Sequence, residues 1–183
     1  MNEGVNRMNN LLDDLLRYAT IGKTETGKQQ IKILDIVEIA IKNLRVSIDE
    51  SKAVIHYDQL PEVYSINSLL IQLFQNMISN AVKFRRDDSH PEIKISWVEN
   101  ENFFEFAIKD NGIGIDPEYK NRIFVIFQRL HARTEYEGTG IGLAICQKIV
   151  QRLGGKIWVD SELGEGATFH FTLPKNGIKN DKL

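Results

Sequence analysis

Three glycines on alternate positions lead directly into an apolar helical pattern, in the stretch EGTGIGLAICQKIV. A glycine has no Cβ and tolerates positive φ, so Gly138, Gly140 and Gly142 let the backbone approach a bulky or polar group closely. The first N–H groups of a helix have no partner within it and lie at the positive end of its dipole, which favours a bound anion. Glycines before a helix are also common in plain loops and caps. This stretch alone therefore leaves phosphate binding and a simple turn as equal alternatives.

The composition is that of one ordinary domain with a hydrophobic core. The 183 residues are 42% hydrophobic and 26% charged, and a net charge of -2 gives no reason to expect a nucleic-acid partner. Cys146 is the only cysteine, which excludes an internal disulfide and a thiolate metal cluster, and we expect it to pack in a helix as a small apolar group. No apolar run approaches the roughly 18 residues of a membrane span, and the amino terminus lacks a signal-peptide pattern. We expect a cytoplasmic protein without a membrane segment.

The first 22 residues read as an amphipathic helix. Its apolar residues recur at intervals of three and four and form one stripe: Val5, Met8, Leu11, Leu12, Leu15, Leu16 and Ala19. A polar linker over residues 23–28 separates this helix from the rest of the chain. We expect an interaction helix outside the main domain that pairs with its own copy. The alternative is an ordinary helix packed on the same core.

Residues 29–175 alternate between strand and helix patterns. QQIKI and AVIHY read as strands, and Asp35 with Glu38 predicts a capped start for a helix that carries Ile36, Ile39, Ala40, Leu44 and Ile48. Asn67 is a candidate cap for a long helix.

The second half of this region predicts two hairpins. One joins PEIKISWV to FFEFAIKD, and the other joins KIWVDS to ATFHFTLP. The predicted fold class is α+β, a two-layer sandwich of about five strands and three helices, with the helices on one face of a largely antiparallel sheet. Residues 176–183 form a polar tail.

Polar side chains on the long helix suggest a metal and phosphate site. Asn76 and Asn80 are four residues apart and share one face, and Lys83 lies one turn beyond Asn80. A carboxamide oxygen suits magnesium, and an ammonium group suits a phosphate oxygen. A single Asn is more often just a solvated side chain, but two aligned in a helix and followed by Lys favour a site.

The stretch KDNGIGIDP is the second candidate. Asp110 ends a predicted strand, and Gly112 and Gly114 follow it. An ionised carboxylate only accepts hydrogen bonds, so it can face the exocyclic amine of adenine while the glycines let the backbone close on the base. The alternative is an Asp-Asn-Gly turn.

A long segment separates Gly114 from Gly138. It begins with a short helix predicted at Asp116 and Pro117, and its later residues include two phenylalanines and two arginines: Phe124, Phe127, Arg129 and Arg133. A connection of this length in a compact domain is typically a lid or a disordered stretch. Its aromatic residues predict that it docks on another surface.

In this order, the motifs resemble those of the catalytic, ATP-binding half of sensor histidine kinases, within the GHKL or Bergerat ATPase superfamily. NMISNAVKF is similar to the N box, DNGIG to the G1 box, IFVIFQRLH to the F box and GTGIGLAI to the G2 box. The resemblance covers about residues 29–174, and FQRLH is especially similar to kinases of the bacteriophytochrome type. Four ordered boxes are far more specific than any one of them.

The resemblance implies ATP and Mg²⁺ as cofactors and a role for each motif residue. Asn80 is then the magnesium ligand, Asn76 and Lys83 lie near the phosphates, and Phe84 forms a wall of the adenine pocket. Asp110 holds the adenine amine beside Gly112 and Gly114, with Thr168 joining through water. Arg129 approaches the terminal phosphate when the lid closes. The implied phosphate seat consists of Gly138, Thr139, Gly140, Ile141, Gly142 and Leu143.

The resemblance also implies a phosphoacceptor histidine with an acidic neighbour and a downstream proline. The four histidines, at positions 56, 90, 131 and 170, lack those neighbours, and His170 lies in a predicted strand whose Phe169 and Phe171 point to the other face. We therefore expect the acceptor outside these residues, on the first helix of a hairpin whose second helix is residues 1–22. The alternative is an acceptor on another chain. The implied partners are that helix, a response regulator and a second copy of the protein.

Two other functions remain open at this point. One is an ATP-gated conformational module, as in the chaperone, topoisomerase and mismatch-repair members of the superfamily, and the other is an anti-sigma-type serine kinase. The hydrolytic members carry a carboxylate on the Asn helix that activates water. Here Gln72 lies four residues before Asn76, and an amide cannot act as a base, which favours the histidine kinase.

Overall fold

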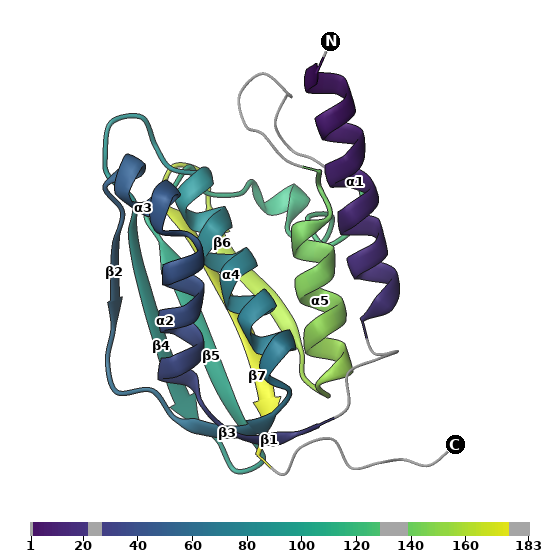
Figure 1. Ribbon diagram of the computed structural model, residues 1–183. Helices are drawn as coiled ribbons and strands as arrows, with labels where there is room; N and C mark the ends of the chain where they lie inside the picture. Colours follow the sequence, from purple (N-terminus) through teal and green to yellow (C-terminus); the bar gives the residue numbers. More distant parts are fainter. Residues whose placement is uncertain (1, 22–26, 129–138, 176–183) are drawn as a thin grey trace.

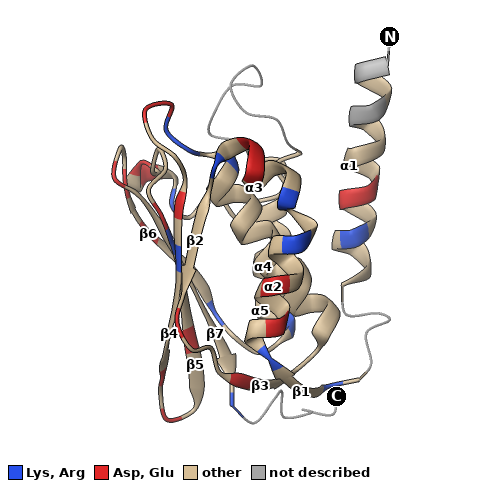
Figure 2. Ribbon diagram, turned by 60° about the vertical axis from the view of Figure 1, so that its left-hand side comes forward, with Lys and Arg blue, Asp and Glu red and all other residues tan. Residues whose placement is uncertain are grey.

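A computed structural model describes residues 2–21, 27–128 and 139–175, and it consists of a sheet layer and a helix layer (Figure 1). The main sheet has the strand order β2-β4-β5-β7-β6, in which β2 is parallel to β4 and the other neighbours are antiparallel. Its strands are β2 (Val54–Tyr57), β4 (Glu92–Glu99), β5 (Phe103–Asp110), β6 (Ile157–Glu162) and β7 (Gly166–Pro174). Figure 2 shows the sheet nearly edge-on, with the helices on one side of it. The predicted fold class is confirmed.

Both predicted hairpins are present. In the first, Ile95 pairs with Ile108, and in the second, Val159 pairs with Phe169. These four side chains are almost fully buried, because alternate residues of a strand point to the same face and that face is covered by helices. Alternation of apolar and polar residues was therefore a reliable signal for this sheet.

The helix layer is built from α2 (Ile33–Asn43), α3 (Arg45–Ser51), α4 (Asn67–Lys83) and α5 (Gly142–Arg152). α4 lies centrally, and its Phe74 meets Phe106 and Phe171 of the sheet edge-on, with ring centroids 6.1 and 5.6 Å away. The buried stripe of α4 repeats at three and four residues, as an amphipathic helix requires: Leu69, Leu70, Leu73, Phe74, Met77, Ile78, Ala81 and Val82. This contact fixes the helix that carries the two candidate asparagines.

Three details of the predicted helices are wrong. α2 begins at Ile33, with Lys32 as its N-cap and no side-chain capping bond, so Asp35 lies inside the first turn instead of capping it. The predicted single helix is interrupted at Leu44, and its last residues form α3. Asn67 is the first residue of α4 and not its cap, and among the described residues its buried Oδ1 has no hydrogen-bond partner.

A small second sheet was not predicted. β1 (Gln29–Lys32) pairs antiparallel with β3 (Glu62–Ser65), and Ile31 faces Val63 in the core. The strand expected at QQIKI is therefore one residue shorter than its pattern, since Ile33 already belongs to α2. This sheet lies at the end of the helix layer that is farther from α3 (Figure 1).

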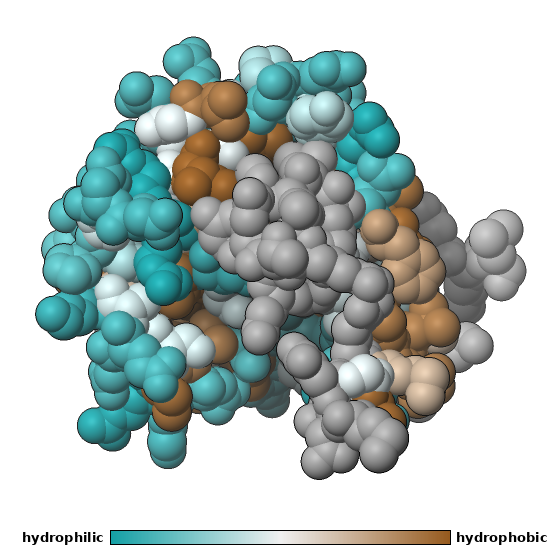
Figure 3. All heavy atoms as spheres, turned by 90° about the horizontal axis from the view of Figure 1, so that it is seen from above, coloured by the Kyte–Doolittle hydropathy of each residue, from teal (hydrophilic) through white to brown (hydrophobic). Residues whose placement is uncertain are grey.

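The amphipathic helix α1 (Asn2–Thr20) lies alongside α5 (Figure 1). Leu11 and Tyr18 pack against the core, whereas much of the apolar stripe is exposed: Val5, Met8, Leu12, Leu15 and Leu16. Figure 3, a view from above, shows apolar surface on the side where α1 lies in Figure 1 and a mostly hydrophilic surface on the other side. Pairing of this helix with its own copy stays a prediction. Among the described helices, none is long and apolar enough to cross a membrane.

Candidate functional site

A cavity of about 300 Å³ is enclosed by α4, α5, α1, the end of β5 and the start of β7. Most of the residues singled out in the sequence line it, although they come from segments far apart in the chain. These are Asn76, Asn80, Lys83, Phe84, Asp110, Gly114, Thr139, Gly140, Gly142 and Leu143. The structure thus brings the N, G1 and G2 motifs together around one cavity.

Asp110 lies at the end of β5, in the floor of this cavity, and is only 8% exposed. Its Oδ1 accepts hydrogen bonds from the backbone N–H groups of Gly112, at 2.9 Å, and Ala167, at 3.2 Å. Burial raises the pKa of the carboxyl above its usual range, and these two N–H groups oppose that shift. Both bonds end on the same oxygen, which leaves Oδ2 as the acceptor for a ligand.

The glycines of the G1 motif are required by close backbone approaches. A Cβ at Gly112 would overlap the carbonyl oxygen of Phe84, which accepts a hydrogen bond from Ile113 N–H at 3.0 Å. Gly114 has a φ of +71°, and a Cβ there would overlap the carbonyl oxygen of Glu162. Gly112 itself does not line the cavity but holds the Asp110 turn against the end of α4.

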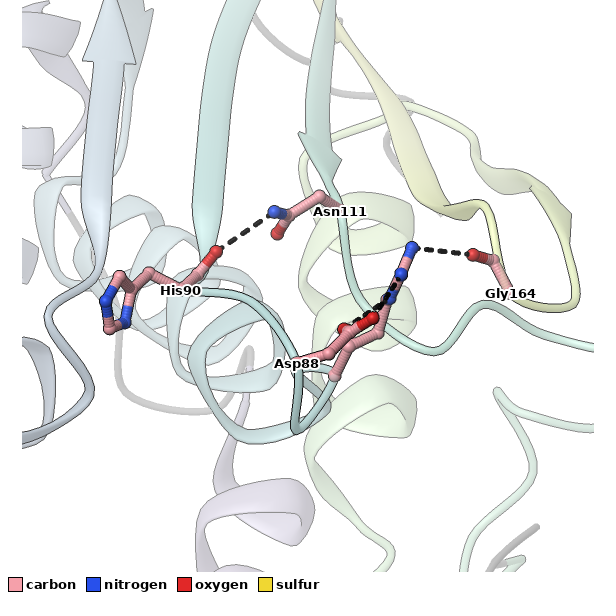
Figure 4. A network of polar contacts seen from close by, with 5 residues as sticks. Asp88, His90, Asn111 and Gly164 are labelled. Carbon is pink, nitrogen blue, oxygen red and sulfur yellow. Dashed lines mark hydrogen bonds and ion pairs between the residues drawn. The ribbon is translucent and has the colours of Figure 1, made fainter.

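Polar contacts outside the cavity fasten the segments on either side of Asp110 (Figure 4). Asn111 donates from Nδ2 to the carbonyl of His90 at 3.0 Å, and its Oδ1 accepts from Glu92 N–H at 2.8 Å. Arg86, paired with Asp88, donates to the carbonyl of Gly164 at 3.3 Å. These bonds tie the end of β5 to β4 and the segment after α4 to the β6–β7 turn.

The two asparagines of α4 differ in their surroundings. Asn76 donates from Nδ2 to the carbonyl of Gly142 at 3.4 Å and contacts the thiol of Cys146, so it links α4 to the start of α5. Burial raises the pKa of the Cys146 thiol to about 12, which keeps it neutral and confirms its expected role as a packed apolar group. Asn80, one turn further on, also lines the cavity.

The cavity offers a donor set that fits a magnesium ion bound to phosphates. Within the described part of the chain, no three His, Cys, Asp or Glu side chains are grouped so that they could hold a metal. An ion at Asn80 would therefore depend on one neutral carboxamide oxygen together with waters and ligand oxygens, which is how magnesium is commonly bound. The ammonium of Lys83 lies 4.5 Å from the centre of the Phe84 ring, so a cation and an aromatic face adjoin in the cavity wall.

Thr168 does not reach the cavity. It alternates along β7 with Ala167 and Phe169, which do line the cavity, so Thr168 points to the opposite face of the sheet, where it pairs with Lys109 and Asp160. This position does not support the expectation that Thr168 joins the contact with the adenine amine through water. Its neighbour Ala167 lines the cavity and donates its N–H group to Asp110.

Other predicted site residues do not line the cavity or cannot be placed. Ile141 is the buried N-cap of α5, behind the cavity wall. Arg129 and Gly138 lie outside the described residues, as do His131 and Arg133.

The segment after Gly114 confirms two smaller predictions. Asp116 caps the short 3₁₀ helix η1 (Pro117–Tyr119) by accepting from Glu118 N–H at 2.9 Å. Phe124 is docked in the core at 8% exposure, as its aromatic character suggested, whereas Phe127 is 59% exposed.

Sequence reasoning missed two charged residues of the cavity. Asp14 and Arg17 of α1 line it, and Asp14 Oδ2 accepts a hydrogen bond of 2.6 Å from the hydroxyl of Thr139. Asp14 and Thr139 are separated by 125 positions in the sequence, and no local pattern marks such a contact. Gln72 and Ser79 of α4 also line the cavity.

The family model described as histidine kinase-, DNA gyrase B- and HSP90-like ATPase matches residues 65–177. Among characterised proteins, the chain is 48% identical over 180 residues to cyanobacterial phytochrome A of Nostoc sp., covering 98% of this chain and 23% of that protein. It is also 48% identical over 174 residues to the phytochrome-like protein Cph1 of Synechocystis sp., covering 93% of this chain and 23% of that protein. The chain thus spans about a quarter of the length of these relatives.

Solved structures share the fold. The full-length ShkA structure in complex with AMPPNP has a TM-score of 0.76 and 26% identity, over 90% of this chain and 35% of that one. The mycobacterial sensor histidine kinase MprB has a TM-score of 0.69 and 23% identity, over 82% of this chain and 98% of that one. The likeness to MprB covers almost all of that structure.

Proposed function

Because the chain belongs to the family of histidine kinase-, DNA gyrase B- and HSP90-like ATPases, we propose that it is the ATP-binding catalytic part of a phytochrome-like sensor histidine kinase. The observation that carries the proposal is the buried carboxylate of Asp110 in the same cavity as the asparagines of α4 and the glycines before α5. One wall of this cavity suits a purine amine and the other suits phosphates.

The base end of the cavity favours adenine. Asp110 is held by two N–H groups on Oδ1, so its other oxygen can accept a hydrogen bond from the exocyclic amine. Guanine presents a carbonyl oxygen at the corresponding position, and two acceptors facing each other would repel. Phe84 and Ile113 supply an apolar surface for the base beside the carboxylate.

The phosphate end combines a cation, an amide and a helix start. Lys83 can neutralise part of the phosphate charge, and the first N–H groups of α5 can donate to phosphate oxygens. Asn80 would hold Mg²⁺ through its carboxamide oxygen, and the bound ion would neutralise the charge that develops on the phosphates. Asn76 bonds to the start of α5, so it positions the helix that seats the phosphates.

The proposed reaction moves the γ-phosphoryl group to an imidazole nitrogen of a histidine outside these residues. The nitrogen lone pair forms a bond to phosphorus, the bond to the bridging oxygen breaks, and ADP leaves. Such a transfer depends on positioning and electrostatics more than on a strong base. Gln72 also lines the cavity, and its amide cannot act as a general base that would activate water.

The proposed partners follow from this reaction. They are the helix of the same protein that carries the acceptor histidine, a response regulator that takes the phosphoryl group onward, and a second copy that pairs through the exposed stripe of α1. A cytoplasmic location belongs to the same proposal, because the reaction consumes ATP.

Calorimetric titration with ATP and GTP tests the base end of the site. We expect the protein to bind ATP in preference to GTP. Asp110→Asn should lower the affinity for ATP and reduce the difference between the ATP and GTP affinities, since an amide can present a donor to the amine. Asp35→Asn, an exposed carboxylate in the first turn of α2, is the matched control. An equal loss of both nucleotides in Asp110→Asn would mean that this carboxylate serves folding and not base selection.

A further inference from the structure

Helix α1 contributes a negative charge to the phosphate end of the cavity. The described charged residues that line the cavity are the cations Arg17 and Lys83 and the carboxylates Asp14 and Asp110. The proposed adenine contact explains Asp110 at the base end. It does not explain Asp14, because a carboxylate beside a phosphate seat repels the phosphates that the seat would hold.

Asp14 is bonded directly to the loop before α5. Its Oδ2 accepts from the Thr139 hydroxyl at 2.6 Å, and Thr139 Oγ1 accepts from Ile141 N–H at 3.4 Å. α5 begins at Gly142, three residues after Thr139. The carboxylate therefore lies where an anion would approach the start of this helix.

A second contact holds α1 on α5, away from the cavity. Lys148 Nζ donates to the carbonyl oxygen of Tyr18 at 2.5 Å and lies 4.1 Å from the centre of its ring. Lys148 does not line the cavity. The described polar contacts between α1 and the α5 region are thus those of Asp14 and Tyr18, and of these two the Asp14 contact lies in the candidate site.

We propose that docking of α1 on α5 and binding of nucleotide phosphates compete, with Asp14 as the group that phosphates displace from Thr139. This inference rests on the proposed ATP site. The Thr139 hydroxyl has one proton and can donate it to Asp14 or to a phosphate oxygen, but not to both. The negative charges of the carboxylate and the phosphates also repel, and in a partly enclosed cavity that repulsion is stronger than in bulk water.

Competition makes the coupling reciprocal. A docked α1 lowers the affinity for ATP, and bound ATP weakens the docking of α1 by the same factor. Adenosine has no phosphates, so its affinity does not depend on α1. Arg17 attracts phosphates and partly offsets the effect of Asp14, which is why the test replaces Asp14 alone.

Asp14→Asn removes the charge and keeps an oxygen acceptor for Thr139. We expect this variant to bind ATP about tenfold more tightly by calorimetry, a difference of about 1.4 kcal/mol, with unchanged affinity for adenosine. Asp13→Asn removes the neighbouring exposed charge, which does not line the cavity, and is the matched control. ATP affinity that is unchanged or lower in Asp14→Asn relative to Asp13→Asn would overturn the competition.

Lys148→Gln tests docking from outside the cavity. It weakens the contact with Tyr18, so ATP affinity should rise while adenosine affinity stays the same. Hydrogen exchange gives the reciprocal measurement: ATP should increase exchange over residues 8–20 of α1, and adenosine should not. Stronger protection of α1 with ATP would show cooperation and contradict the proposal. If the unaltered protein bound neither adenosine nor ATP, the proposed function itself would fail, which is a distinct outcome.

Discussion

At the scale of single residues, the burial of Asp110 couples its proposed role in nucleotide binding to the stability of the domain. The carboxylate faces the cavity with two N–H groups on one oxygen, yet burial raises its pKa. A group selected only for stability would not be an acid kept in an unfavourable environment. The proposed adenine site requires such a buried carboxylate, because it must accept a hydrogen bond from the amine inside the cavity.

The raised pKa predicts a specific pH dependence of stability. Between the ordinary pKa of an Asp and the higher pKa of folded Asp110, the folded state holds a proton that the unfolded state has released. The contribution of Asp110 to the free energy of unfolding is therefore larger at acidic pH and declines as pH rises through the raised pKa. Asp110→Asn has no charge to bury, so its free energy of unfolding should increase relative to that of the unaltered protein as pH rises.

Urea unfolding of both proteins between acidic and neutral pH measures this difference. We expect the stability of Asp110→Asn relative to the unaltered protein to increase from acidic to neutral pH. A constant difference across this range would show that Asp110 titrates at its ordinary pKa.

Asn80 is the residue on which the proposed magnesium dependence rests. Asn80 lines the cavity, and the described residues offer no cluster of three carboxylate, His or Cys side chains that could hold the ion in its place. We expect Asn80→Ala to abolish the gain in ATP affinity that magnesium gives, with adenosine binding retained. Calorimetry with and without the ion measures both, and Asn43→Ala, in the last turn of α2, is a control. Undiminished magnesium dependence in Asn80→Ala would remove this residue from the metal site.

At the scale of elements, the strands and their pairing were largely predictable. Ile93, Ile95, Phe106 and Ile108 alternate with less buried residues along β4 and β5, because one face of the sheet is covered and the other is open. The long helix was evident from its apolar stripe. The G1 motif follows the end of β5 and the G2 motif precedes α5, whereas the N motif lies in the second half of α4.

What the sequence could not supply came from contacts between distant segments. β1 was expected as a strand, but the four-residue strand β3 and its pairing with β1 were not. The break at Leu44 has no Gly or Pro to mark it. Thr168 points away from the cavity, because a shift of one residue along a strand changes the face. Asp14 reaches Thr139 only because α1 lies along α5.

The turn between β5 and η1 depends on Gly114. This residue has a φ of +71°, and a Cβ would overlap the carbonyl oxygen of Glu162. We expect Gly114→Ala to lower the free energy of unfolding by about 2 kcal/mol or more, because the backbone conformation and the overlap are both unfavourable.

Gly142→Ala is the matched control for this substitution. Gly142 begins α5, and a Cβ there would meet no atom within 4 Å. We expect a change of less than about 1 kcal/mol in its free energy of unfolding, as for a helix position with room for a methyl group. Equal losses in the two variants, measured by urea unfolding, would contradict the structural distinction between these glycines.

At the scale of the whole molecule, the two-layer fold supplies the nucleotide cavity and α1 supplies an apolar surface for a partner helix. The two-layer fold encloses the cavity, and α1 lies beside it with an apolar stripe exposed toward solvent. An acceptor helix that pairs with this stripe would bring its histidine near the nucleotide. Placing the acceptor in this way supplies most of the catalysis expected of a phosphoryl transfer.

The most direct test of the account is transfer of radiolabel from the γ-phosphate of ATP. We expect the chain alone to acquire no label, because none of its four histidines has the neighbours of an acceptor. Adding a separate fragment that carries the acceptor helix should yield label on that fragment, and acid should remove it, as it does from a phosphorus–nitrogen bond. An acid-stable label on the chain itself would identify a hydroxyl acceptor and contradict the assignment of this protein as a histidine kinase.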